Sequence, residues 1–583
     1  MDEKPKSLWK KPWTGPRGML LWFSLIAAVA FVLIFGVGLL TGGTNSLAES
    51  AAFSLLFAAV LAVIAVLAVA LIRWLFCRRN FKRSLFALAC LATVVALLYA
   101  EEDWRGKHAL EKFKRGWEAK GEKFDFAGIA PAPVPDEQNF AMSPVIASSY
   151  STMLDANGHE MKPRNTNVIN RLEMHTYEQI GGIDGPKGNG GWRKGQITDL
   201  KEWQEYYHRA ASRTNLFPIP SEPQSPAADV LLALSKYDST IKELREAASQ
   251  RPHSRYPLNY GGGFPMAILL PHLASLKGCV QVLELRAIAE LDSGQSEKAL
   301  DDINLMLRLA DSIRTEPLLI SHLVRIALVS IAIQPVWEGL AEHKWSEAQL
   351  AVLERELGTL DFLADYEYAM RGERACSISA IEYVRRHRQY IGYMNEGDNG
   401  TPDSPFVASV SHLIPASFFY QNELAIARMH QQWILPLVDV ERRIVSPEMT
   451  RQATNSIVQL GRRYNPYTIF AAMLVPALGR SAERFGSTQT AIDLARVACA
   501  LERYRLVHGQ YPEALDVLAP QFIDKIPHDI INGQPLKYRC TGDGQFVLYS
   551  VGWNETDDGG QVALTKTGTV DVEKGDWVWQ YPK

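Results

Sequence analysis

Acidic residues are nearly missing from the first hundred positions of this 583-residue chain. Asp2, Glu3 and Glu49 are the three that occur there, against ten lysines and arginines, so this part has a formal charge of +7. The remaining residues hold 51 basic and 61 acidic side chains, a formal charge of −10. Because most of the chain is net acidic, it lacks the basic surface that nucleic acid requires, and we predict no nucleic-acid partner.

Cysteine is also scarce, with six among 583 residues, which excludes a small disulfide scaffold. The sequence lacks the motifs His-Glu-x-x-His, Cys-x-x-Cys and Gly-x-Ser-x-Gly, which mark metal sites and catalytic nucleophiles. Seven glycines lie within residues 181–195, but no Gly-Lys-Ser/Thr follows them, so we expect a mobile surface loop rather than a phosphate-binding loop. The sequence therefore predicts no catalytic and no cofactor-binding residue.

Three uncharged runs occupy the basic first hundred residues. Residues 19–40 and 51–72 each comprise 22 residues without a charge. About 20 apolar residues cross a bilayer, and both runs are too long for the apolar core of a signal peptide. Residues 85–100 form a run of 16, which can still cross where the bilayer thins locally. We predict a membrane anchor of three helices over residues 1–100.

The basic residues of this anchor predict its orientation. Five precede the first run and five lie between the second and the third, whereas the loop at residues 41–50 has none. Lysine and arginine are enriched in cytoplasmic loops, so the N-terminus is expected in the cytoplasm. If the third run spans, residues 101–583 lie on the other side. These patterns predict a protein of the bacterial inner membrane with a large extracytoplasmic part.

Beyond the anchor, helical spacing dominates. We expect a charged helix at residues 103–125, followed by a proline-rich linker and an irregular region up to residue 225. Residues 226–478 are predicted to form an all-helical domain. Within it, Ala287, Gly294 and Ala299 occupy the small-residue positions of a tetratricopeptide-like helical hairpin. An irregular helical domain without repeats remains the alternative.

Residues 479–583 read as a small α+β domain. A long helix is expected at residues 479–508 and a short one near residues 513–518. Runs rich in β-branched and aromatic residues, separated by Gly/Asp-rich turns, predict four strands. These strands are expected at residues 536–540, 546–551, 562–565 and 577–581.

This tail resembles the globular part of the major pseudopilin of type II secretion. The matching segments, in this order, are residues 500–504, 509–512, 533–538, 548–552 and 557–560. Pseudopilins begin with a cleaved leader and a single apolar assembly helix. Here the domain stands at the C-terminus behind a three-helix anchor, which argues against direct packing into a pseudopilus.

The chain as a whole is similar to uncharacterised membrane-anchored proteins of planctomycete and verrucomicrobial type. This resemblance supports location and domain order and implies no activity. The segments that carry it are residues 139–142, 305–315, 419–422, 465–467 and 551–560.

The pseudopilin resemblance implies a structural calcium site. The loop that corresponds to residues 554–560 helps to bind calcium in the major pseudopilins, and Asn554, Asp557 and Asp558 would supply side-chain oxygens here. A plain turn is the alternative, since consecutive acids before Gly-Gly also favour turns. Cys499 and Cys540 fall within this small domain, so either a disulfide or two isolated thiols are expected.

These observations predict a membrane-tethered, non-enzymatic module for protein–protein interaction or assembly, with envelope proteins as partners. Two alternatives stay open. One is an envelope hydrolase whose active site the sequence does not reveal. The other is an accessory component of a type II secretion or pilus-like system.

Overall fold

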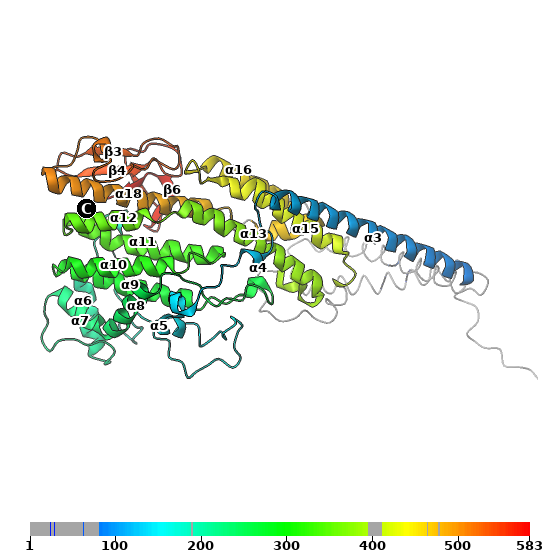
Figure 1. Cartoon of the computed structure of the whole chain (residues 1–583), viewed down its shortest axis with the longest axis horizontal. Helices are drawn as coiled ribbons and strands as arrows, with labels where there is room; N and C mark the ends of the chain where they lie inside the picture. The colour runs from blue at the N-terminus through cyan, green and yellow to red at the C-terminus, as the bar shows by residue number, and fades with distance from the viewer. Residues whose placement is uncertain are drawn as a thin grey trace, which may run out of the picture. The chain divides into compact units, whose positions relative to one another are not determined.

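The computed structural model describes residues 81–187, 190–394, 411–462, 465–475 and 478–582, together with Ser24, Ala28 and Ala62 (Figure 1). The predicted spans at residues 19–40 and 51–72 therefore lie outside the described residues apart from these three positions. The chain divides into two compact units, Met1–Glu102 and Asp103–Lys583.

Helix α3, Phe81–Glu118, is continuous for 38 residues, so the predicted third span and the charged helix after it form one element. The apolar side chains of its first half contact little else, since Phe86 is 72% exposed and Leu97 is 64% exposed, whereas Leu110 farther along the helix is buried. Exposed apolar side chains in one continuous stripe are typical of a surface that lies in lipid.

Three described helices are long and apolar enough to cross a membrane, which indicates a membrane protein. They cover Leu85–Glu118, Pro265–Asp292 and Leu319–Ala341. None of the apolar window of the first is buried, whereas 39% and 56% of the windows of the other two are buried inside the folded unit. We therefore treat α3 as the membrane-spanning helix and the other two as interior helices.

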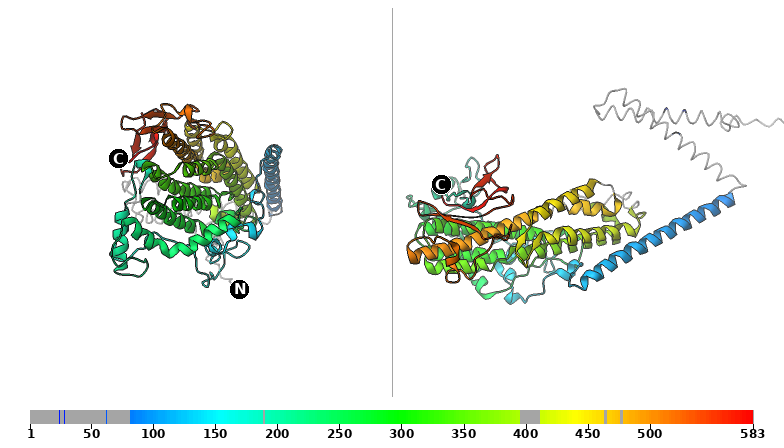
Figure 2. Two further views of the ribbon diagram at one scale, coloured as in Figure 1. Left: turned by 60° about the vertical axis from the view of Figure 1, so that its left-hand side comes forward. Right: turned by 90° about the horizontal axis from the view of Figure 1, so that it is seen from above.

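The unit that begins at Asp103 is mostly helical. Helices α9, α10 and α11 pack against one another, and Figures 1 and 2 show them side by side. Its longer helices are α6 (Leu200–Ala211), α7 (Pro226–Leu234), α8 (Asp238–Gln250), α9 (His272–Asp292), α10 (Ser296–Asp311), α11 (Leu319–Ala341), α12 (Glu347–Gly358), α13 (Phe362–Arg386), α15 (Ala416–Met429), α16 (Pro447–Arg462), α17 (Ile469–Leu474) and α18 (Ser481–His508).

The predicted hairpin at residues 276–313 is present as α9 and α10. Gly294 lies in the turn between them with φ +74°, a left-handed conformation that favours glycine. Ala287 and Ala299 are fully buried, which lets the two helices approach closely. The hairpin is thus present, and its membership of a tetratricopeptide array stays a prediction.

The last hundred residues combine α18 with short strands, as expected from the sequence. A three-stranded antiparallel sheet has the order β3-β4-β7, and a separate pair joins β5 to β6. The strand β6 was not predicted, because its sequence VDVEKG is largely charged. The strands are β3 (Lys537–Cys540), β4 (Phe546–Ser550), β5 (Val562–Leu564), β6 (Val570–Gly575) and β7 (Trp577–Trp579).

Helix α18 connects this sheet to the helical layer. It packs against α11, α12 and α13 on one side and against β4 and β7 on the other, and Figure 1 shows it between α12 and the strands. One hydrophobic core includes residues from Phe124 to Trp579. The irregular region, the helical region and the tail therefore share a core.

The described cysteines are free thiols, so the alternative of two isolated thiols holds for Cys499 and Cys540. Cys499 is buried in α18, and burial raises the pKa of its thiol. Cys540 is exposed on β3, where its thiol donates a hydrogen bond to the carbonyl of Pro512 at 3.2 Å.

Replacing Ser346 with alanine tests the start of α12. Ser346 accepts a hydrogen bond from the backbone N–H of Gln349, whose side chain accepts one from the N–H of Ser346. Loss of this capping box is expected to lower the free energy of unfolding by about 1 kcal/mol. Thermal unfolding of the full-length protein in detergent measures it. Ser293→Ala is the control, since Ser293 follows α9 and its hydroxyl has no partner within the described chain; equal melting temperatures for the two variants would refute the capping role.

Candidate functional site

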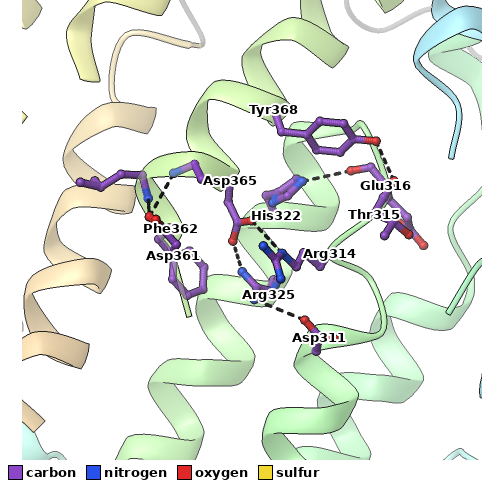
Figure 3. Close-up of polar contacts among 12 residues, drawn as sticks. Asp311, Arg314, Thr315, Glu316, His322, Arg325, Asp361, Phe362, Asp365 and Tyr368 are labelled. Carbon is purple, nitrogen blue, oxygen red and sulfur yellow. Dashed lines mark hydrogen bonds and ion pairs between the residues drawn. The ribbon is translucent and has the colours of Figure 1, made fainter. Parts of the chain in front are cut away.

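A buried network of charges joins α10, α11 and α13 (Figure 3). The Arg325 side chain is fully buried, forms an ion pair with Asp365 and lies 3.8 Å from Asp311. Arg314 approaches the same Asp365 carboxylate at 3.5 Å. Burial raises the pKa of Asp365 to about 6, although both arginines oppose this effect.

The histidine beside this network is neutral. Burial, with the positive charge of Arg325 nearby, lowers the pKa of His322 to about 3. Its Nε2 donates to the carbonyl of Glu316 at 3.1 Å. A neutral histidine bound to a backbone carbonyl is typical of a structural role. We therefore assign the network to holding three helices in register.

A second polar cluster binds the glycine-rich loop to α11. Gln334 and Glu338 lie one helical turn apart on this helix and are both buried. The N–H of Trp192 donates to Gln334 Oε1 at 2.7 Å. The N–H and hydroxyl of Thr198 both donate to Glu338 Oε1, at 3.0 and 2.7 Å. The expectation of a mobile surface loop is therefore wrong for residues 190–198.

Two glycines of this loop are required by close packing. A Cβ at Gly190 would lie 2.3 Å from Gln334 Nε2. A Cβ at Gly195 would lie 2.4 Å from the carbonyl oxygen of Tyr581, and its φ of +67° is itself left-handed. The loop is glycine-rich here because its backbone meets α11 and the C-terminal segment at short range.

Tryptophan contacts join the loop to the C-terminal segment. Trp192 is buried, and its ring lies 5.5 Å from that of Trp579 in β7, centroid to centroid. Trp337 of α11 donates its indole N–H to the carbonyl of Gln580. The loop is thus held between α11 and the end of the sheet.

A groove of about 480 Å³ opens where this loop meets α9, α11, α18 and β6. Its volume lies in the range of sites that hold small molecules or short peptide segments. Ile326 and Ile331 of α11, with Val570 and Val572 of β6, give it apolar walls.

Three cationic side chains line the groove without a partner. Arg193, Lys194 and Arg484 make no hydrogen bond and no ion pair with any part of the chain that the structure describes. The Arg193 guanidinium lies over the Trp192 ring, 5.1 Å from its centroid. Removal from water lowers the pKa of Arg193 to about 10. An unpaired, desolvated cation is unfavourable, and an anion would relieve it.

Among the described residues that line the groove, Glu284 of α9 is the acidic one. Its carboxyl has no hydrogen-bond or ion-pair partner in that same set of residues. Burial, with the negative charge of Glu338 nearby, raises the pKa of Glu284 to about 8. At neutral pH the groove therefore presents three cations and a mostly protonated carboxyl group.

The hydroxyl groups in the groove are not set up as nucleophiles. Ser487 and Thr488 both donate to the carbonyl of Arg484, at 3.1 and 2.8 Å, within α18. Ser330 of α11 also lines the groove, and among the described residues no hydrogen bond joins any of these three hydroxyls to Glu284. The arrangement is suited to binding an anion rather than to attacking a bond.

Sequence reasoning did not find this groove. Its polar residues come from the loop, α9 and α18, nearly 300 positions apart in the chain. No spacing pattern connects them. The one signal in the sequence was the pair of basic residues after Trp192 within a glycine-rich run.

Comparisons of the chain with protein-family models, with curated proteins and with solved structures find no match. The groove is therefore interpreted from its own residues.

The residues of the predicted calcium site do not converge on one point. The Asn554 amide donates to Asp558 at 2.8 Å, whereas Asp557 accepts from the Tyr549 hydroxyl and forms an ion pair with Lys537 at 3.2 Å. Among the described residues, no group of three or more His, Cys, Asp or Glu side chains is placed to hold a metal ion. The calcium site stays a prediction of the resemblance.

Replacing Arg325 with methionine tests the buried network. The change leaves Asp365 buried with Arg314 as its remaining partner, and it is expected to lower the free energy of unfolding by roughly 3–5 kcal/mol. Adding Asp365→Leu should recover much of the loss, because neither buried charge then remains. Unfolding of the full-length protein in detergent measures both.

Arg355→Met is the matched control for this test. Arg355 is 67% exposed and pairs with its neighbour Glu356, so its loss should change stability by less than about 1 kcal/mol. If Arg325→Met is no less stable than Arg355→Met, the network does not hold the helices together.

Replacing Gly195 with alanine tests the position of the loop. The new methyl group would clash with the carbonyl of Tyr581, so the loop should detach and the amides of Trp192 and Thr198 should exchange about tenfold faster with solvent deuterium. Hydrogen exchange with mass spectrometry on the full-length protein measures this. Gly181→Ala is the control, because no atom lies within 4 Å of a Cβ built there. Unchanged exchange in Gly195→Ala would contradict the packing argument.

Proposed function

We propose that the chain is a membrane-tethered, non-enzymatic binding module of the bacterial envelope, with proteins as partners. The observation that supports this most is the groove between the loop, α11 and α18. The side chains of its three cations make no hydrogen bond and no ion pair among the described residues, although Arg193 lies over the Trp192 ring and the charge of Arg484 acts on Glu483. Such groups are typical of a site that waits for a ligand.

In this proposal α3 supplies the tether, with its N-terminal side toward the cytoplasm and the unit from Asp103 outside. The exposed apolar stripe of α3 supports membrane insertion, and the distribution of basic residues supports the orientation. We take the α9–α10 hairpin as tetratricopeptide-like and the tail as related to the major pseudopilin. Both relationships concern modules that bind other proteins, which supports a role in assembly.

An envelope hydrolase is the second candidate. One observation favours it: the pKa values of Glu284 and Arg193 are shifted in opposite directions beside the same groove. Shifted titratable groups in a cleft mark many catalytic sites. Against it, Glu284 has no hydrogen-bonded hydroxyl or histidine among the described residues, so a general acid or base is present without a nucleophile.

Site-specific photo-cross-linking tests the binding function. A benzoyl-phenylalanine introduced at Val570, in the groove, is expected to give discrete adducts with other envelope proteins when native membranes are irradiated. The same probe at Val517, which is 52% exposed and lies outside the groove, serves as the control. Adducts that appear equally from both positions, or from neither, would contradict a binding site in this groove.

A further inference from the structure

We infer that this groove binds the terminal carboxylate of a peptide whose last side chains are apolar. The inference rests on the proposed binding function and names the chemistry of its ligand. Carboxylate recognition is assigned to Arg193, Lys194 and Arg484, and the apolar side chains are assigned to the walls.

The three cations predict that the ligand carries a negative charge. A guanidinium donates two parallel N–H groups to one carboxylate, and such charge-assisted hydrogen bonds are about twice as strong as neutral ones. Arg193 and Lys194 belong to the loop and Arg484 to α18, so two segments distant in the chain supply the cations that line the groove. Since the Arg193 side chain is half-buried and lacks a partner, an anion that reaches it gains an interaction little screened by water.

Glu284 is the reason that we expect the charged group of the ligand to be a carboxylate rather than a more highly charged anion. A protonated carboxyl group can donate its proton in a short hydrogen bond to a carboxylate. Once ionised it would repel any anion, and it would repel a dianion most. A groove with this acid in its wall therefore fits a singly charged group that can share a proton.

The apolar walls of the groove predict the part of the ligand that precedes its carboxylate. Ile326 and Ile331 face the groove from α11, and Val570 and Val572 from β6. In the described part of the sheet, β6 pairs with β5 alone, so it is an edge strand. Edge strands accept an extended peptide through backbone hydrogen bonds, with alternate side chains in pockets. A carboxyl end preceded by apolar residues matches both features.

The affinity should depend on pH through Glu284. The charged neighbour that acts on this carboxyl is Glu338 of α11, while Arg193, Lys194 and Arg484 line the same groove. Above its pKa of about 8 Glu284 is ionised and repels the ligand, while Arg193 stays largely charged below pH 9. Binding is therefore expected to be strongest near pH 6.5 and to weaken as the pH rises to 9.

Isothermal titration with the full-length protein in phosphatidylcholine nanodiscs tests the inference. The probes are the peptide acetyl-Ala-Ala-Leu-Val-Leu with a free carboxyl end, the same peptide as its amide, and 4-methylpentanoate. The free-acid peptide should bind at least about tenfold more tightly than the amide, since the amide lacks the charge. It should also bind more tightly than 4-methylpentanoate, which lacks the backbone.

The variants assign the effect to the groove. Arg193→Met and Arg484→Met should each weaken binding of the free acid about tenfold, and Arg193→Lys should retain part of the affinity. Glu284→Gln should abolish the pH dependence. Arg442→Met, at an arginine that is 81% exposed and lies outside the groove, should change nothing. Unchanged melting temperatures show that each variant is folded.

Four outcomes would overturn the inference. If the peptide amide binds as tightly as the free acid, the groove does not recognise a carboxylate. The same conclusion follows if Arg193→Met and Arg484→Met both bind the free acid normally. If 4-methylpentanoate binds as tightly as the peptide, the occupant is a free organic acid and the peptide part is wrong. If the probe at Val570 gives adducts but the peptide does not bind, the proposed binding function stands and the carboxylate ligand is refuted. If there are neither adducts nor peptide binding, the proposed function itself is refuted.

Discussion

The hydrogen bonds that Gln334 and Glu338 make with the glycine-rich loop determine where the groove lies. Both side chains project from α11, and together they accept from the backbone of Trp192 and from both donors of Thr198. Because these groups are buried, leaving them unpaired would cost about 1–3 kcal/mol each. The loop is therefore held against the helix, and Arg193 is held at the border of the groove. Without this attachment, α11 and α18 would border open solvent.

Two different uses of buried charge coexist in the folded unit. Around Arg325, each buried charge has an opposite charge within reach, so the network connects helices. Around Arg193, the cations have no partner in the described chain, and Glu284 is mostly protonated at neutral pH. The presence or absence of an opposite charge therefore distinguishes the structural cluster from the one suited to binding.

The sequence predicted most of the elements and none of the site. Periodicity located the α9–α10 hairpin, the long helix α18 and four strands, because each depends on local patterns of apolar residues and glycine turns. It missed β6, whose charged residues resemble a turn. It misread the loop at residues 190–198, because the groups that fix it, Gln334 and Glu338, follow about 140 positions later. Contacts between distant segments leave no periodic signal, so a groove built from four elements could not be predicted.

Two charged groups of the groove, Arg193 and Glu284, are unfavourable for the stability of the fold. Arg193 is a half-buried cation, and Glu284 is a carboxyl group that is driven toward its neutral form. Apolar residues at both positions would avoid these desolvation penalties, and they would extend the walls that Ile326 and Val572 already provide. Arg193 stacks over the Trp192 ring, and neither the Arg193 nor the Glu284 side chain makes a hydrogen bond or an ion pair among the described residues. A ligand that neutralises the cation and accepts the proton of the acid would satisfy both groups at once, so the two groups that are unfavourable for folding are the ones that would drive binding.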